Sequence, residues 1–357
     1  MTSIEGNKIK KLENKTRNFI SHPYTRFVSK KGVFYLIVIF VALSLTFAIP
    51  RLMPGNPVQR VIRPPPSGIS PEAMDRYMDM QEHMMVAFGL NKSLPEQYID
   101  FWFGIFRLDF GVSYSARGRP ILDLVFPRLF FTLALVIPVL FISFFVGNYI
   151  GGRAAFLKGK SNTLVYYFIV IVQSAPFYWL ALLFYIIFVI DLQIFPVYGW
   201  STPEHIPGID LVADITNFIR YFILPFSVLL VGETGGWATG MRAMTLYEMD
   251  SEYLLYSQQL GFKKGLLQGY AQRNAILPQL TGLNLRLNGL IGQTLIIEAI
   301  FGWPGLGSIA LNAVNAQDYP LIVGTFMITL IVVVVGNFLV DITYGFIDPR
   351  IRTGYGG

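Results

Sequence analysis

The chain has 357 residues, of which 53% are hydrophobic and only 14% are charged, with a formal net charge of +6. Soluble domains carry about 25% charged residues, so this composition excludes an ordinary soluble fold. The basic residues gather beside apolar segments rather than in the continuous stripe that nucleic acid binds, and the lack of cysteine excludes disulfides and cysteine nucleophiles.

Six segments of the chain are apolar and long enough to cross a membrane. The hydrocarbon core is about 30 Å thick and a helix rises 1.5 Å per residue, so one crossing takes about 20 apolar residues. The segments are residues 32–52, 129–150, 164–190, 222–241, 276–301 and 321–344. We therefore expect an all-α, polytopic protein of the plasma (cell) membrane with about six transmembrane helices.

The charges around these segments predict their orientation. Residues 1–31 form a basic segment ahead of the first span, and the positive-inside rule places this segment in the cytoplasm. Six crossings return the C-terminal tail, residues 347–357, to the same side. The basic segments 151–160 and 242–273 then also lie inside, whereas the predicted external loop 191–219 carries acidic residues and no Lys or Arg.

Residues 53–128 form the largest predicted external segment, which we expect to be a small structured cap. Loops longer than about 60 residues largely escape the charge rule, so its arginines do not contradict the orientation. The run Pro64-Pro65-Pro66 favours extended polyproline geometry, and residues 71–88 are typical of a Met-rich amphipathic helix. Asn91-Lys92-Ser93 fits a glycosylation acceptor.

The sequence shows no motif for enzymatic chemistry. Gly159-Lys160-Ser161 matches the end of a phosphate-binding loop, but that motif needs a glycine where this chain has Ala154. Metalloprotease, nucleophile-elbow and dinucleotide-binding patterns are missing too, and the three histidines are scattered. We therefore expect no enzyme activity, metal or cofactor in this chain. Energy for transport would come from an ion gradient or from a partner ATPase.

Three charged residues fall well inside the predicted spans, where each costs about 2.5–3.5 kcal/mol on insertion scales. They are Glu233, Arg286 and Glu298. One interpretation is the polar lining of a translocation path for a hydrophilic solute, to which Trp179 and Trp303 could add stacking surfaces. The other interpretation is interhelical salt bridges and packing. The sequence leaves both open.

The connection between the fourth and fifth spans, residues 242–278, carries several features in order. Glu252 opens a predicted short helix, Gly261 permits a left-handed turn nine residues later, and Pro278 lies at the entry to the next span. This pattern resembles the coupling loop of ABC importer permeases, a short helix that docks on a nucleotide-binding subunit. The resemblance assigns the coupling role to Glu252, Tyr253, Leu254, Leu255, Gln258, Gly261, Phe262 and Pro278.

Further blocks extend the resemblance over residues 47–352 and identify the dipeptide/oligopeptide, binding-protein-dependent branch. The most specific block is residues 298–307, in which Trp303-Pro304-Gly305 predicts a reverse turn. The other blocks are residues 51–57, 88–90, 97–98, 108–111, 174–180, 195–199, 318–320 and 341–350. The chain departs from the branch at Asn56, where Asp is usual, and at residues 256–260, where many relatives carry small residues.

The resemblance implies a permease subunit whose motor is another polypeptide. A second homologous permease would complete the path, and two nucleotide-binding ATPase subunits holding ATP and Mg would drive it. An extracellular solute-binding protein would deliver oligopeptides, or oligosaccharides, which some members of the branch carry. The alternative is a gradient-driven secondary transporter, which predicts paired midplane carboxylates and symmetric halves; neither is evident in the sequence.

Overall fold

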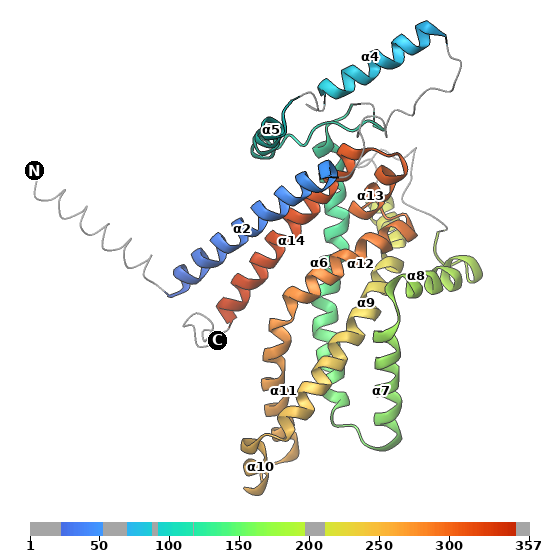
Figure 1. The fold of residues 1–357 in the computed structure, drawn as a ribbon. Helices are drawn as coiled ribbons and strands as arrows, with labels where there is room; N and C mark the ends of the chain where they lie inside the picture. Colours follow the sequence, from blue (N-terminus) through green and yellow to red (C-terminus); the bar gives the residue numbers. More distant parts are fainter. Residues whose placement is uncertain (1–22, 53–69, 88–91, 117, 197–210, 348–357) are drawn as a thin grey trace, which may run out of the picture.

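The computed structural model describes residues 23–52, 70–87, 92–116, 118–196 and 211–347, and these are almost entirely helical, which confirms the all-α class. The polyproline run, the glycosylation acceptor Asn91, the blocks 53–57 and 88–90 and both chain termini lie outside the described residues. α4 and α5 lie at one end of the bundle and α10 at the other (Figure 1). The elements are α2 (Pro23–Leu52), α4 (Pro71–Ala87), α5 (Leu94–Arg107), α6 (Ile121–Ala154), α7 (Gly159–Ser174), α8 (Phe177–Tyr185), the π-helical turn η1 (Ile186–Asp191), α9 (Leu211–Met249), α10 (Glu252–Gln259), α11 (Lys264–Thr281), α12 (Leu283–Phe301), α13 (Leu306–Asn315) and α14 (Tyr319–Ile347).

Within the described residues, four to six helices are long and apolar enough to cross a membrane. Four single helices, within α2, α6, α9 and α14, are long and apolar enough. Two bent pairs, α7 with α8 and η1, and α12 with α13, bring the number to six if each pair counts as one span. Six spans, the expected number, are reached only when both bent pairs are counted as broken spans.

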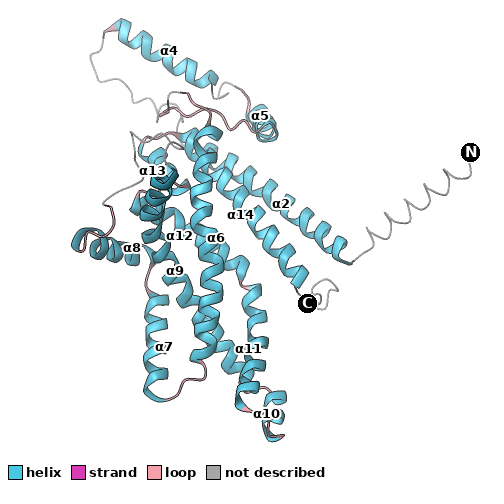
Figure 2. Cartoon of the chain, turned by 180° about the vertical axis from the view of Figure 1, so that it is seen from behind, coloured by secondary structure: helices cyan, strands magenta, loops and turns pink. Residues whose placement is uncertain are grey.

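The third predicted span, residues 164–190, is not one straight helix. The chain bends by 98° between α7 and α8. Ala175 is extended there, with ψ 126°, because Pro176 disfavours a helical conformation in the residue before it and donates no backbone N–H. α8 consequently runs at a steep angle to the long helices and projects from one side of the bundle (Figures 1 and 2). Its Phe177 ring packs so closely on α9 that a side chain at Gly232 would collide with it.

The fifth predicted span, residues 276–301, is also divided. Residues 276–281 are the last turns of α11, and Pro278 lies inside that helix rather than at the start of the next one. α12 begins at Leu283 and ends at Phe301, and the capping residue Gly302 adopts the left-handed conformation with φ 63°. The predicted reverse turn at Trp303-Pro304-Gly305 is confirmed, since the Gly305 N–H donates to the Trp303 carbonyl at 2.8 Å.

The centre of the bundle is the contact between α6 and α9. Gly147 and Gly151, one turn apart on α6, lie so close to α9 that a Cβ at either position would collide with its backbone. Small residues at this spacing let helices in a membrane approach closely. Trp237 of α9 fills the adjoining space and packs edge-on against Phe144 at a centroid distance of 5.1 Å. This contact fixes α9, which carries Glu233 and leads to α10.

α2 lies at the periphery and is joined to α14 by polar contacts at Asp341. The Asp341 carboxylate accepts hydrogen bonds from Lys31 Nζ at 2.6 Å, from Tyr35 Oη at 3.0 Å and from Asn284 Nδ2. One turn further along α12, Asn288 Oδ1 accepts from Asn337 Nδ2 of α14 at 2.8 Å. The asparagines that interrupt the predicted fifth span therefore bind α14.

At the external end, the predicted amphipathic helix over residues 71–88 is confirmed as α4. Asp318 links the loop before α6 to the start of α14 through hydrogen bonds. Its Oδ2 accepts from Ser113 Oγ at 2.6 Å and from Ser115 Oγ at 2.7 Å. The Asp318 side chain also caps α14 by accepting from the Leu321 N–H at 3.2 Å. Burial and then the Asp318 carboxylate raise the pKa of Tyr114.

Candidate functional site

α10 is an eight-residue helix at the end of the bundle opposite α4 and α5 (Figure 1). α9 continues to Met249, so residues 242–249 of the predicted connection are helical rather than a loop. A short turn then leads to Glu252, the first residue of α10. Its position in the first turn suits the positive end of the helix dipole.

The C-terminal end of α10 explains the glycine at position 261. The Phe262 N–H donates to the Ser257 carbonyl at 3.2 Å and the Gly261 N–H donates to the Gln258 carbonyl at 3.0 Å. This pair of bonds is a Schellman motif, which requires a left-handed residue at Gly261. Gly261 has φ 80°, so the conformation expected from the sequence is present.

Two side chains hold α10 against its neighbours. Leu254 is 2% exposed and packs against Met249 of α9 and Leu267 of α11. The Tyr253 hydroxyl donates to Glu248 Oε2 at 2.9 Å and accepts from Asn274 Nδ2 at 2.6 Å. Burial, together with the hydrogen bond to Glu248, raises the pKa of Tyr253.

The rest of the α10 surface is exposed and largely apolar. Gln258 is exposed as well, and Glu252 lies at the exposed start of the helix. The exposed fractions of the apolar and aromatic side chains are 46% for Leu255, 62% for Tyr256, 60% for Leu260 and 47% for Phe262. An apolar surface at the tip of a helix that is fixed from behind is suited to binding another protein.

Glu233 and Arg286 form an ion pair between α9 and α12. Arg286 Nη1 lies 3.5 Å from Glu233 Oε2, with the Glu233 side chain 4% exposed and that of Arg286 36% exposed. The guanidinium lies over the Trp237 ring at 5.1 Å from its centroid. Gly236 makes room for it, since a Cβ there would collide with the guanidinium. The pair therefore has one enclosed and one accessible member.

Glu298 and Trp303 lie in a packed interior instead. The Glu298 carboxylate accepts from Thr132 Oγ1 and from the Gly307 N–H, each at 2.6 Å, and the side chain is 0% exposed. Trp303 is 1% exposed, and its Nε1 donates to the Phe131 carbonyl at 2.9 Å. For both residues the structure favours the packing interpretation. No sequence pattern identifies Thr132 as the partner of Glu298, because the two residues are 166 positions apart.

Trp179 is 52% exposed on α8, apart from the packed turn that holds Trp303. Within the described part of the chain, no group of three His, Asp or Glu side chains could hold a metal ion. Among the described residues of the predicted site, exposed side chains gather on α10, and Arg286 and Trp179 are accessible as well.

Comparison with known proteins gives a family match over residues 147–353, to the "Binding-protein-dependent transport system inner membrane component". A Brucella abortus protein named "Putative peptide transport system permease protein" is 31% identical over 330 residues, which cover 92% of this chain and 99% of that protein. The oligopeptide transport system permease protein AppB of Bacillus subtilis is 27% identical over 91% of this chain and 99% of its own length. The dipeptide transport system permease protein DppB of Alkalihalophilus pseudofirmus is 29% identical over 89% of this chain and 96% of its own length.

Proposed function

The chain belongs to the family of binding-protein-dependent transport system inner membrane components and is a permease subunit of an ABC importer in the plasma membrane, and from this premise we propose how it couples and what it carries. The gradient-driven alternative finds no support among its relatives. We propose that ATP and Mg bind in two partner ATPase subunits and that this chain has no hydrolytic activity of its own. A second homologous permease and an extracellular solute-binding protein complete the assembly.

We propose that α10 is the surface through which the ATPase subunits move this chain. The observation that carries the proposal is the exposed apolar surface of Leu255, Tyr256 and the following Leu260, on a helix that the buried Leu254 and the hydrogen bonds of Tyr253 fix to α9 and α11. Such a helix transmits force as a rigid body, because its buried face is continuous with α9 and α11. Movement of α10 would thereby reach the membrane-spanning part of α9.

The test places a charge on the exposed face, with Tyr256→Asp and Leu260→Asp. The ATPase subunits should then fail to co-purify, or ATP hydrolysis should stop responding to solute. Tyr270→Asp is the matched control, because Tyr270 is 42% exposed but lies on α11. If the α10 variants assemble and retain solute-stimulated hydrolysis, the proposed docking surface is wrong.

We propose further that the path carries peptides and that Arg286 meets their C-terminal carboxylate. The names of the relatives support peptides over oligosaccharides. The accessible guanidinium, braced by Glu233 and the Trp237 ring, can exchange one carboxylate partner for another without leaving its place. Trp179, exposed on α8, adds a stacking surface in this proposal, whereas the packed Glu298 and Trp303 do not.

Uptake by the reconstituted transporter tests this assignment with paired substrates. Arg286→Gln should raise the KM for a peptide with a free C-terminus about ten- to a hundredfold, since a hydrogen bond to a charged group contributes about 1.5–3 kcal/mol. The C-terminally amidated peptide should be unaffected. Arg153→Gln is the control, because Arg153 lies over the Tyr149 ring at the end of α6. Equal loss for both peptides would refute recognition of the carboxylate.

A further inference from the structure

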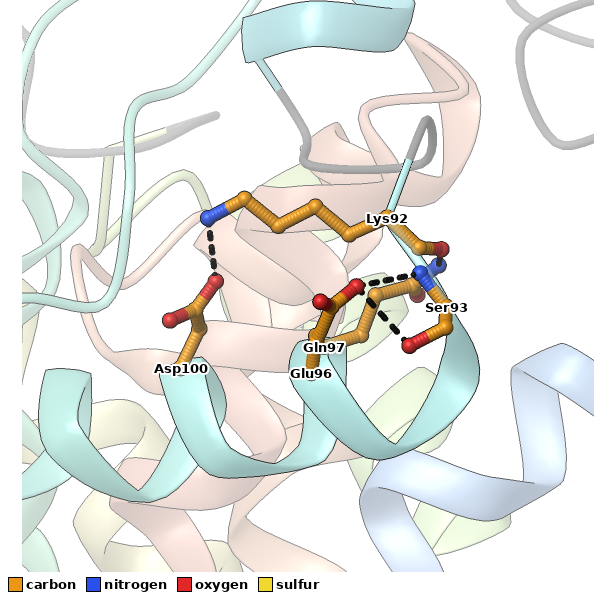
Figure 3. A network of polar contacts seen from close by, with 5 residues as sticks. All are labelled: Lys92, Ser93, Glu96, Gln97 and Asp100. Carbon is orange, nitrogen blue, oxygen red and sulfur yellow. Dashed lines mark hydrogen bonds and ion pairs between the residues drawn. The ribbon is translucent and has the colours of Figure 1, made fainter.

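α5 lies at the external end of α2 (Figure 1) and has three chemically different sides. Its polar side carries Glu96 and Asp100, and Figure 3 shows both on the same side of the helix as Lys92. Lys92 Nζ donates to Asp100 Oδ2 at 2.5 Å, and Glu96 Oε2 accepts from the N–H and the hydroxyl of Ser93 at 2.9 and 2.8 Å. The carboxylates of the polar side are therefore paired with the two residues that precede α5.

A second side of α5 packs on α2. The Tyr98 and Ser44 hydroxyls lie 2.8 Å apart, and the Phe47 ring packs edge-on against Tyr98 at a centroid distance of 5.2 Å. Trp102 stacks on Phe40 at 5.1 Å. These contacts fix the rotation of α5 about its axis, and so decide which side chains point away from the protein.

The third side, between the other two, is apolar and exposed. Ile99 is 53% exposed, Phe103 57% and Phe106 79%, and at 100° per residue these three fall on one arc. Arg107 follows at the end of α5, with its Cζ 5.8 Å from the centroid of the Phe103 ring. We call Ile99, Phe103 and Phe106 the apolar arc of α5.

The apolar arc continues the membrane-facing surface of α2. Leu36 is 67% exposed, Ile37 57% and Phe40 52%, on a helix apolar enough to span the membrane. From Phe40 the apolar surface passes to Trp102, whose ring lies 6.1 Å from that of Phe106. One unbroken surface therefore joins α2, which lies in lipid, to the arc.

The depth of α5 also fits the lipid interface. The apolar span within α2 ends at Ala48, and at 1.5 Å per residue the contact residues Phe47, Ser44 and Phe40 lie about 2, 6 and 12 Å inside that end. Interfacial amphipathic helices bury their apolar face about 5–10 Å into the boundary between headgroups and acyl chains. Such a helix requires a polar side whose charges are paired, an apolar side, and a terminal Arg that can reach a lipid phosphate.

We propose that α5 is a membrane-interface helix, whose apolar arc inserts into the outer leaflet and anchors the external cap to the bilayer. The segment between the first two spans is then not wholly an aqueous loop. The proposal rests on the membrane residence of the chain and is independent of the roles proposed for α10 and Arg286.

The chain contains no cysteine, so single cysteines can be introduced and spin-labelled without any background substitution. Phe103→Cys and Phe106→Cys report on the apolar arc, and Asp100→Cys is the matched control on the polar side, about 60° and 120° from them around the helix. The full-length chain is reconstituted in nanodiscs of phosphatidylethanolamine and phosphatidylglycerol. Collision rates with oxygen, which partitions into lipid, and with a water-soluble nickel chelate are then measured for each label.

We expect the oxygen-to-nickel ratio on the apolar arc to exceed that on the polar side by several-fold. Ile99→Cys repeats the measurement should either phenylalanine variant fail to fold. Equal ratios on the two sides overturn the proposal. So does shielding of the apolar arc from nickel that occurs only after a solute-binding protein is added, because the arc would then be a protein-docking surface.

Discussion

Replacing Glu298 distinguishes a packing role for this residue from a role in the translocation path. Its carboxylate accepts one hydrogen bond from the Thr132 hydroxyl and one from the Gly307 N–H, at zero exposure. Glu298→Ala leaves both donors unpaired. An unsatisfied buried group costs about 1–3 kcal/mol, so two give about 2–6 kcal/mol, with about 4 kcal/mol as the middle of that range.

The assay is the thermal melting of the purified transporter, followed by loss of its monodisperse chromatographic peak. About 4 kcal/mol corresponds to a Tm lower by roughly 8–16 °C, at roughly 2–4 °C per kcal/mol for a domain of 150–250 residues. Thr294→Val is the control on the same helix, since the buried Thr294 hydroxyl donates only to the carbonyl of Leu290, at 2.7 Å. Its cost should stay within about 1 kcal/mol.

Thr132→Val should couple with Glu298→Ala, because both remove the same hydrogen bond. The double variant should therefore cost less than the sum of the two single changes, by about 0.5–3 kcal/mol. A Glu298→Ala transporter with an unchanged Tm and no uptake would refute the reasoning. Glu298 would then act on solute rather than hold the turn between α12 and α13 to α6.

Two further predictions concern the external and peripheral helices. Asp341→Ala removes the acceptor for Lys31, Tyr35 and Asn284, so backbone hydrogen exchange along α2 should become faster. Lys30→Ala, next to Lys31 in the sequence, is the control and should leave the exchange rates unchanged. Equal exchange in both variants would count against the Asp341 contacts. The hydrogen bonds that Ser93 donates lower the pKa of Glu96 below its ordinary value of 4.5. A lowered pKa in the folded state means that this cap stabilises α5 fully above pH 4.5 and is lost as the pH falls further. A spin label on α5 should accordingly gain mobility on acidification below pH 4.5, and Glu96→Gln should abolish that pH response.

The features that the sequence predicted correctly are those that depend on neighbouring residues. Apolar length located the membrane helices, the amphipathic pattern located α4, and Gly261 and Trp303-Pro304-Gly305 marked turns that the structure contains. Each follows from backbone geometry or from hydropathy within about 20 residues. Ala175-Pro176 carried a local signal for the bend between α7 and α8, but the apolar run on both sides favoured one straight span.

The partners of the polar residues were decided by tertiary structure alone. Asn284 and Asp341 are 57 positions apart, and Thr132 and Glu298 are 166 apart, so no sequence pattern pairs them. Tertiary structure also decided the environment of Glu298. Its charge inside a predicted span suggested a place in the translocation path, but its carboxylate is buried against Thr132 of α6. Composition by itself determined that this chain lives in a membrane. Which buried charges face one another, which remain accessible as Arg286 does, and which side of α5 faces lipid follow only from how the helices pack, because packing brings distant residues within bonding distance.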